Sequence, residues 1–285
     1  METWPPAVRM ASRFIAGTDL AGALEAGRRI NRQGLAVTFA YLGEHCASTP
    51  EAAASREVYL ELLEEIARQG LDANVSIKPT QFGMDVSETE CRANVEQLVR
   101  RAAALDNFVR LDMESSAYTD RTLALTTELH ARYGSVGTVI QSYLYRSRED
   151  VERLCEGGIR VRLCKGAYLE PPEVAFRRKA EVDRNFLELM RMLVARGAYP
   201  AIATHDEKMI AGTREFAAAN GVPSDAFEFQ MLYGIRRDLQ RKLAAEGYKV
   251  RLYVPFGRAW FPYFMRRLAE RPANLLFLLR NLWRG

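Results

Sequence analysis

Eight short runs rich in β-branched and aromatic residues alternate with segments long enough to form helices. These expected strands lie at residues 34–42, 74–79, 107–114, 136–144, 159–168, 199–206, 227–234 and 249–257. Strands that alternate with helices run parallel, because each helix carries the chain back to the start of the next strand. Eight such units in 285 residues favour a closed (β/α)8 TIM barrel of the α/β class over an open, doubly wound sheet.

Helical spacing is visible between the expected strands. The segment 55–70 places Val58, Leu62 and Ile66 on one face, and Gly70 follows where a helix is expected to end. Ahead of the first strand, LAGALEAGRRINRQG also has helical spacing. We therefore divide the chain into an N-terminal helical arm at 1–33 and a barrel domain at 34–285, whose last part, 258–285, follows the eighth strand.

Composition excludes several classes of protein. The 40 basic and 36 acidic residues are interspersed and leave a net charge of +4, which argues against binding of nucleic acid. The four cysteines are scattered, with no C-x-x-C motif and no grouping with the three histidines that would resemble a zinc site, so no metal site is expected. The N-terminus lacks the pattern of a secretory signal, and no apolar run approaches the ~20 residues of a membrane-spanning helix. We expect a cytoplasmic protein.

Alternation within the strands predicts a charged barrel interior. In the third run, Val109, Leu111 and Met113 share the face expected to pack against the helices. The inward face of this and other runs carries polar side chains: Ser76, Lys78, Arg110, Asp112, Glu114, Arg162, Arg251 and Tyr253. Because an unpaired buried charge costs several kcal/mol, these groups must be paired, solvated or bound to a ligand. We expect a site at the carboxyl ends of the strands.

The segment PYFMRRLAER (262–271) follows the eighth run after a short loop. Pro262 is tolerated in a first helical turn, so a helix is expected to begin here. Glu270 lies four residues after Arg266 and three after Arg267, close enough on a helix to pair with one guanidinium. Two adjacent arginines could clamp a carboxylate; the alternative is a solvated basic helix face.

A set of motifs, in this order along the chain, resembles the proline dehydrogenase family in its monofunctional bacterial form. They fall on seven of the eight expected strands and on the last helix: SIKPTQ (76–81), RLDME (110–114), QSYLYRS (141–147), RLCKGAY (162–168), ATHD (203–206), FEFQMLYG (227–234), LYVPFG (252–257) and YFMRRLAE (263–270). The resemblance covers about residues 34–280. It implies a distorted (β/α)8 barrel that binds FAD non-covalently and oxidises L-proline to Δ1-pyrroline-5-carboxylate. It further implies electron transfer to a membrane quinone, with peripheral attachment to the inner face of the cytoplasmic membrane.

The resemblance also implies a substrate site. Its members would be Lys78, Asp112, Tyr253, Arg266, Arg267 and Glu270. The lysine and both arginines would ion-pair with the proline carboxylate, while Asp112 and Arg162 would act as catalytic residues. Tyr253 would pack against the substrate ring, and in this family a tyrosine there accompanies proline whereas a serine accompanies hydroxyproline.

The implied FAD site uses a second set of residues, which are Met113, Gln141, Arg162, Cys164, Lys165, Gly166, Thr204 and His205. A hydride would leave C5 of proline for N5 of the flavin. Two positions depart from the family pattern: Cys164 stands where valine is expected, and Asp206 stands where asparagine often follows the histidine. Asp206 could repel a nearby phosphate, so its role is open.

Two other functions fit parts of the sequence. A barrel lyase or aldolase could form a Schiff base through Lys78 or Lys165, both near strand ends. A docking module could instead use LLFLLRNLW (275–283) as an amphipathic patch for a membrane or a partner. In the enzyme, the same patch could give access to quinone or pack against the barrel.

Overall fold

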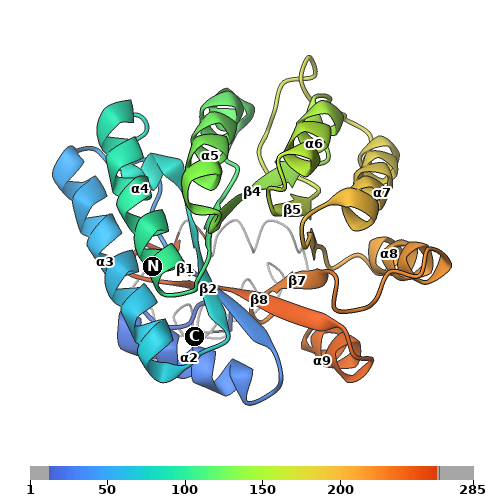
Figure 1. The fold of residues 1–285 in the computed structure, drawn as a ribbon, viewed down its shortest axis with the longest axis horizontal. Helices are drawn as coiled ribbons and strands as arrows, with labels where there is room; N and C mark the ends of the chain where they lie inside the picture. The colour runs from blue at the N-terminus through green and yellow to red at the C-terminus, as the bar shows by residue number, and fades with distance from the viewer. Residues whose placement is uncertain (1–12, 262, 264–285) are drawn as a thin grey trace, which may run out of the picture.

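The computed structural model describes residues 13–261 and 263, and within them eight parallel strands close into a barrel ringed by helices (Figure 1). The elements in chain order are α2 (Leu20–Asn31), β1 (Ala36–Tyr41), α3 (Thr49–Gln69), β2 (Ala73–Ile77), η1 (Pro79–Phe82), α4 (Glu88–Ala104), β3 (Val109–Leu111), η2 (Ser116–Tyr118), α5 (Thr119–Tyr133), β4 (Val136–Gln141), α6 (Ser147–Glu156), β5 (Val161–Cys164), α7 (Lys179–Arg196), β6 (Ala201–Ala203), α8 (Glu207–Ala219), β7 (Glu228–Leu232), α9 (Arg237–Ala245) and β8 (Lys249–Phe256). Each strand pairs with the next, and β8 pairs with β1. The predicted (β/α)8 barrel is confirmed.

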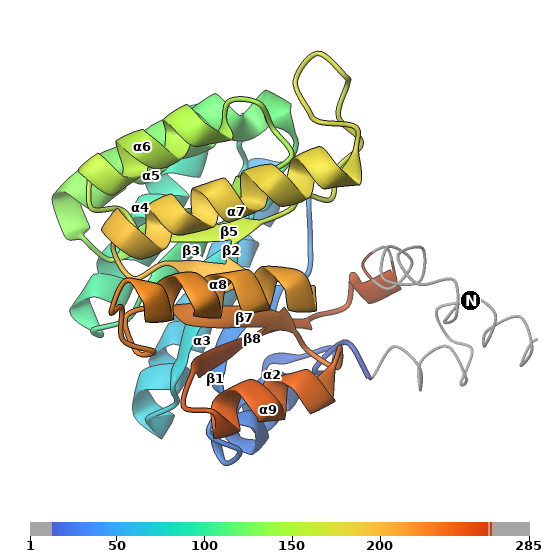
Figure 2. The same ribbon diagram turned by 90° about the vertical axis from the view of Figure 1, so that its right-hand side faces the viewer.

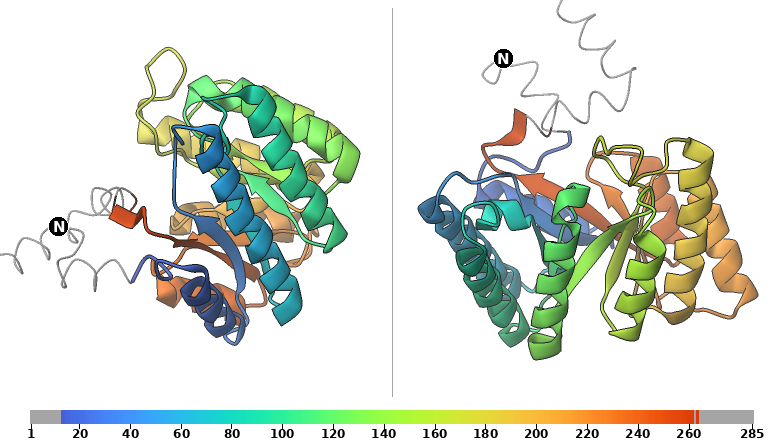
Figure 3. Two further views of the ribbon diagram at one scale, coloured as in Figure 1. Left: turned by 90° about the vertical axis from the view of Figure 1, so that its left-hand side faces the viewer. Right: turned by 90° about the horizontal axis from the view of Figure 1, so that it is seen from above.

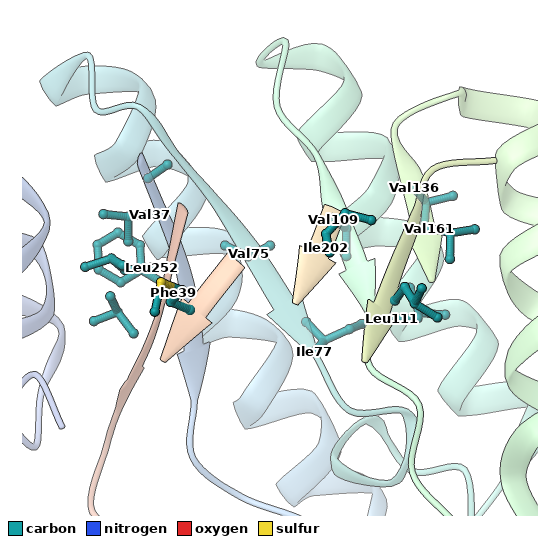
Figure 4. Close-up of a cluster of buried hydrophobic side chains, with 14 of the residues drawn as sticks. Val37, Phe39, Val75, Ile77, Val109, Leu111, Val136, Val161, Ile202 and Leu252 are labelled. Carbon is teal, nitrogen blue, oxygen red and sulfur yellow. The ribbon is translucent and has the colours of Figure 1, made fainter. Parts of the chain in front are cut away.

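The outward faces of the strands form the core between barrel and helices (Figure 4). Val75 and Ile77 of β2 and Val109 and Leu111 of β3 are completely buried there. Their alternation with inward polar residues is the pattern that the sequence predicts. The apolar layer therefore lies outside the sheet, and the polar side chains lie inside it.

The helix expected within 55–70 is α3, which begins earlier than the apolar spacing suggested. Ser48 caps it by accepting a hydrogen bond from the backbone N–H of Glu51 at 3.4 Å. Gly70 ends it in the left-handed region with φ 60°, where glycine has no steric penalty. Leu62 and Ile66 are buried against the barrel, as their spacing predicts.

The third strand is shorter than its predicted run. β3 ends at Leu111, opposite Ile77 at the end of β2, and Pro79 has no N–H to extend the pairing. The predicted inward direction of Glu114 is therefore wrong: its carboxylate accepts hydrogen bonds from the backbone N–H and hydroxyl of Thr80. Met113 was expected to face the helices, but it lines a cavity at the barrel mouth.

The first described helix takes the place that a helix after the last strand has in a regular barrel. α2 packs against β1, β8 and α3, and Gly27 lies so close to Phe39 that a Cβ would fall 2.6 Å from its ring. At the carboxyl ends of the strands, Trp260 and Tyr263 pack with Phe14 in a second apolar cluster. Residues just before α2 and just after β8 are thus joined at that end (Figure 2).

None of the helices within residues 13–261 has the length and apolar character needed to cross a bilayer. The apolar patch 275–283 and the first part of the predicted N-terminal arm lie outside the described residues.

Candidate active site

A cavity of about 710 Å³ opens at the carboxyl ends of the strands. The loop after β5, the segment before α2 and the segment after β8 lie at this same end of the barrel (Figure 3). The cavity is lined by every predicted site residue within the described part of the chain: Lys78, Asp112, Met113, Gln141, Arg162, Cys164, Lys165, Gly166, Thr204, His205 and Tyr253. Arg266, Arg267 and Glu270 lie outside the described residues. The volume of the cavity falls within the range of small-molecule and cofactor sites.

Asp112 joins three strands through its carboxylate. Oδ1 accepts hydrogen bonds from the hydroxyl of Ser76 at 2.5 Å and from Nη1 of Arg162 at 2.7 Å. Oδ2 accepts one from the hydroxyl of Tyr253 at 2.8 Å. Burial, and then the charge of Asp112, raise the pKa of Tyr253 far above its usual value, so this phenol stays protonated and donates.

Lys78 carries a positive charge at the cavity wall. Burial acts to lower its pKa, but the nearby carboxylates of Asp112 and Glu44 outweigh burial and raise the pKa overall. Its Nζ lies 3.7 Å from Oε1 of Glu44. A charged ammonium suits an anionic ligand such as a carboxylate. It does not suit a Schiff-base nucleophile, which must be a neutral amine.

Below Asp112, a chain of polar contacts runs through the barrel interior. Nε of Arg162 donates to Oε1 of Gln230 at 2.5 Å, and Nε2 of Gln230 donates to Oε1 of Glu228 at 2.5 Å. Glu228 also accepts from Nε of Arg251 at 3.0 Å. These contacts fix the Arg162 guanidinium from two sides, and its Nη2 remains buried without a hydrogen-bond partner.

A second buried polar atom without a hydrogen-bond partner belongs to Gln141. Its Nε2 donates to the backbone carbonyls of Met113 at 3.1 Å and Glu114 at 3.3 Å, while its Oε1 has no partner. Buried polar groups in proteins are almost always hydrogen-bonded. Since Gln141 and Arg162 both line the cavity, a ligand with an acceptor and a donor would satisfy both atoms.

Lys165 is held between two aspartates. Its Nζ lies 2.5 Å from Oδ1 of Asp183 and 2.7 Å from Oδ2 of Asp206. Burial acts to raise the pKa of both aspartates, but the hydrogen bonds from Lys165 prevail and lower them. Asp206 also caps α8 by accepting from the backbone N–H of Lys208 at 3.0 Å. The departure at Asp206 therefore has a local structural reason.

The remaining predicted cofactor residues have defined local roles. His205 accepts a hydrogen bond at Nε2 from the backbone N–H of Leu232 at 3.0 Å. Burial raises the pKa of the Cys164 thiol to about 11. Gly166 has φ 115°, and a Cβ there would fall 2.4 Å from the ring of Tyr143. Glycine is thus required here by the tyrosine, whatever the ligand.

The cavity also contains residues that sequence reasoning did not select, namely Glu44, Tyr168, Gln230 and Tyr263. Tyr168 ends the motif RLCKGAY, and Gln230 has the inward position in the strand 228–232, so the sequence held a signal for both. Glu44 lies in a loop, where no periodicity indicates a direction. Among the residues that the structure describes, no three His, Cys, Asp or Glu side chains gather to hold a metal ion.

Comparisons with known proteins give a consistent result. The family model described as Proline dehydrogenase matches residues 23–280. Proline dehydrogenase 1 of Bacillus subtilis subsp. natto is 41% identical over 272 residues, which cover 95% of this chain and 90% of that protein. Proline dehydrogenase of Deinococcus radiodurans is 41% identical over 281 residues, covering 97% and 91%. A crystal structure of proline utilization A (PutA) from Bdellovibrio bacteriovorus, inactivated by N-propargylglycine, matches with a TM-score of 0.86 at 28% identity. That match covers 92% of this chain and only 32% of the PutA chain.

Proposed function

The chain belongs to the proline dehydrogenase family, and on this premise we propose that it oxidises L-proline to Δ1-pyrroline-5-carboxylate with FAD bound in the cavity. One observation carries the proposal: the residues expected to hold substrate and cofactor, taken from six different strand ends, line a single cavity. This reaction would be the first step of proline breakdown.

The residues present fit a flavin. The buried Nη2 of Arg162 is a donor without a partner, and the buried Oε1 of Gln141 is an acceptor without one. A flavin ring offers both acceptors and donors along its edge. The proposed FAD residues are Met113, Gln141, Arg162, Cys164, Lys165, Gly166, Thr204 and His205. When bound, FAD would supply the redox chemistry by accepting at N5 the hydride from C5 of proline.

The chain's own residues would bind and orient the substrate. Lys78 would pair with the proline carboxylate, together with Arg266 and Arg267, whose role rests on the sequence. Tyr253 would pack against the substrate ring while its hydroxyl stays on Asp112. Holding a reactant in one orientation can lower a barrier by several kcal/mol, and this is the main contribution we assign to the protein.

We assign Asp112 and Arg162 to the catalytic set because both line the cavity and their ion pair joins a residue proposed for the substrate to one proposed for FAD. Their ion pair, supported by Ser76 and Gln230, would keep the guanidinium in place at the cavity wall. A fixed positive group there would favour developing negative charge on a bound ligand. Glu270 would complete the substrate site by pairing with one of the two arginines, again on sequence grounds.

The electron acceptor is proposed to be a membrane quinone, with the protein attached peripherally to the inner face of the cytoplasmic membrane. This part rests on the family resemblance. The apolar patch 275–283 is the candidate contact.

The Schiff-base alternative is not favoured. Lys78 is held in its charged form, and Lys165 is paired with Asp183 and Asp206. The test is to supply the purified protein with L-proline and a soluble quinone and to detect the cyclic imine by mass spectrometry. Imine formation that depends on both compounds supports the proposal. Covalent trapping of a carbonyl substrate by borohydride at Lys78 or Lys165, without imine formation, would instead establish a Schiff-base enzyme.

A further inference from the structure

The connection between β5 and α7, residues 165–178, projects beyond the barrel end (Figure 2). Tyr168 on this loop lines the cavity, whereas the next residue, Leu169, is fully exposed at 104%. Burial raises the pKa of Tyr168, and the carboxylate of Glu44 raises it further while Lys78 acts in the opposite sense. Tyr168 shares this cavity with Glu44 and with Lys78, the residue proposed to receive the substrate.

The second half of the loop is attached by its backbone. The backbone N–H of Phe176 donates to the carbonyl of Tyr143 at 2.7 Å, and that of Tyr145 donates to the carbonyl of Val174 at 3.0 Å. The rings of Tyr145 and Phe176 also pack edge to face at 4.6 Å. These contacts fix residues 174–176 on the connection between β4 and α6.

The first half, which carries Tyr168, has a side-chain attachment. The carboxylate of Glu170 accepts from the backbone N–H of Ser116 at 2.7 Å and from its hydroxyl at 2.5 Å. It also accepts from the hydroxyl of Tyr143 at 3.3 Å. Burial, and then Glu170, raise the pKa of Tyr143, so this phenol remains a donor.

One carboxylate thus ties together three loops at the cavity mouth. Ser116 follows Asp112 and Met113 on the connection after β3, and Tyr143 follows Gln141 on the connection after β4. Hydrogen bonds to an ionised group are stronger than those between neutral groups. Two of these three donors, the backbone N–H and the hydroxyl, belong to Ser116. Losing these hydrogen bonds would free the segment around Tyr168 without removing any side chain that lines the cavity.

We propose that Glu170 is a positioning residue that holds Tyr168 against the substrate half of the cavity and thereby sets the affinity for L-proline. The inference rests on the proposed function above. A loop that must be ordered at the moment of binding weakens affinity, because the ordering cost is subtracted from the binding free energy.

The variants Glu170→Ala, Glu170→Gln and Ser116→Ala test the proposal, with Glu173→Ala on the same loop as the matched control, since Glu173 is exposed. We expect Glu170→Ala to raise KM for L-proline about tenfold while kcat stays within about twofold and FAD content is unchanged, the pattern of lost binding rather than lost chemistry. Glu170→Gln keeps one acceptor oxygen, so its KM for L-proline should lie between those of Glu170→Ala and the unaltered protein. Ser116→Ala keeps the backbone donor and should raise KM about threefold.

Hydrogen exchange gives a readout that does not depend on turnover. The amides of residues 166–170 should exchange about tenfold faster in Glu170→Ala than in Glu173→Ala. A double variant with Ser116→Ala should be no worse than Glu170→Ala alone, because both remove the same contact. If Glu170→Ala does not fold, Glu170→Gln and Ser116→Ala decide the matter.

Unchanged KM and unchanged exchange in folded Glu170 variants would overturn the positioning role. An equal fall in kcat, FAD content and melting temperature would overturn it as well, since that pattern indicates general destabilisation. If the unaltered protein shows no turnover of proline, the proposed function fails. The exchange rates would then still decide whether Glu170 holds the loop.

Discussion

Oδ1 of Asp112 lies 2.7 Å from Nη1 of Arg162, and the two side chains are only 13% and 7% exposed. This ion pair connects the polar interior of the barrel to the cavity above it. On one side Arg162 reaches Gln230 and, through it, Glu228. On the other side, the carboxylate of Asp112 accepts a hydrogen bond from the hydroxyl of Tyr253 and raises the pKa of Lys78. The geometry of the proposed substrate site therefore depends on the largely buried carboxylate of Asp112.

Replacing Asp112 with asparagine keeps the shape of the side chain and removes its charge. Burial then acts on Lys78 with one fewer opposing carboxylate, and Arg162 loses its ion-pair partner. We expect kcat/KM for L-proline to fall about 100-fold, since small misplacements of orienting groups cost that much. Steady-state kinetics would show this, with exposed Asp225→Asn as the control. A value within twofold of the unaltered protein would mean that Asp112 does not organise the site.

Arg266→Met and Arg267→Met should each raise KM for L-proline by about 100-fold or more, because a charged pair with the carboxylate is lost. FAD should remain bound, since neither residue is assigned to the cofactor. Kinetics combined with the flavin content of the purified variants measure both effects. The exposed Arg237→Met serves as control. Loss of flavin at unchanged KM would place these arginines in a different role.

Glu228→Ala should lower the free energy of unfolding by about 3 kcal/mol, because it leaves a buried arginine without its closest carboxylate. Glu228 is 2% exposed and accepts from both Arg251 and Gln230. Glu228→Gln should cost less, since it preserves the packing. Urea denaturation measures the difference, and the exposed Glu61→Ala should change stability by no more than about 0.5 kcal/mol. Equal stability of all three variants would show that the interior network contributes nothing.

The contacts of Lys165 predict a dependence of stability on pH. Hydrogen bonds from Lys165 lower the folded-state pKa of Asp206 in spite of its burial. A lowered pKa gives stability that is fully present above the unfolded-state pKa of about 3.9 and is lost as pH falls through the folded-state value. Asp206→Asn keeps a capping side chain, so it should cost about 1 kcal/mol near pH 7 and nothing at pH values well below the folded-state pKa of Asp206. A penalty that stays constant with pH would contradict the assignment.

The sequence predicted the barrel because its signal is local. Each strand alternates in character, and Arg162 and Tyr253 point inward as that alternation requires, where both contact Asp112. The prediction failed for Glu114 and Met113 because a period of two has no meaning once the strand has ended at Leu111.

Loop residues of the site were not predicted from the sequence for a related reason. Glu44 and Tyr168 reach the cavity through the course of their loops, which is set by distant contacts such as those of Glu170 with Ser116. Nothing near Glu44 in the sequence indicates its direction, whereas Tyr168 ends the motif RLCKGAY and so had a signal. Asp206 could be read only as a departure from a pattern, whereas the structure shows it capping α8 and pairing with Lys165.

The most direct test of the central claim is an anaerobic titration of the purified protein with L-proline, followed by visible absorption. The account predicts flavin bands that survive dialysis and bleach as L-proline is added, with one flavin reduced per chain and no change on adding L-alanine. A protein that takes up no FAD, or whose flavin bands do not respond to L-proline, would contradict it.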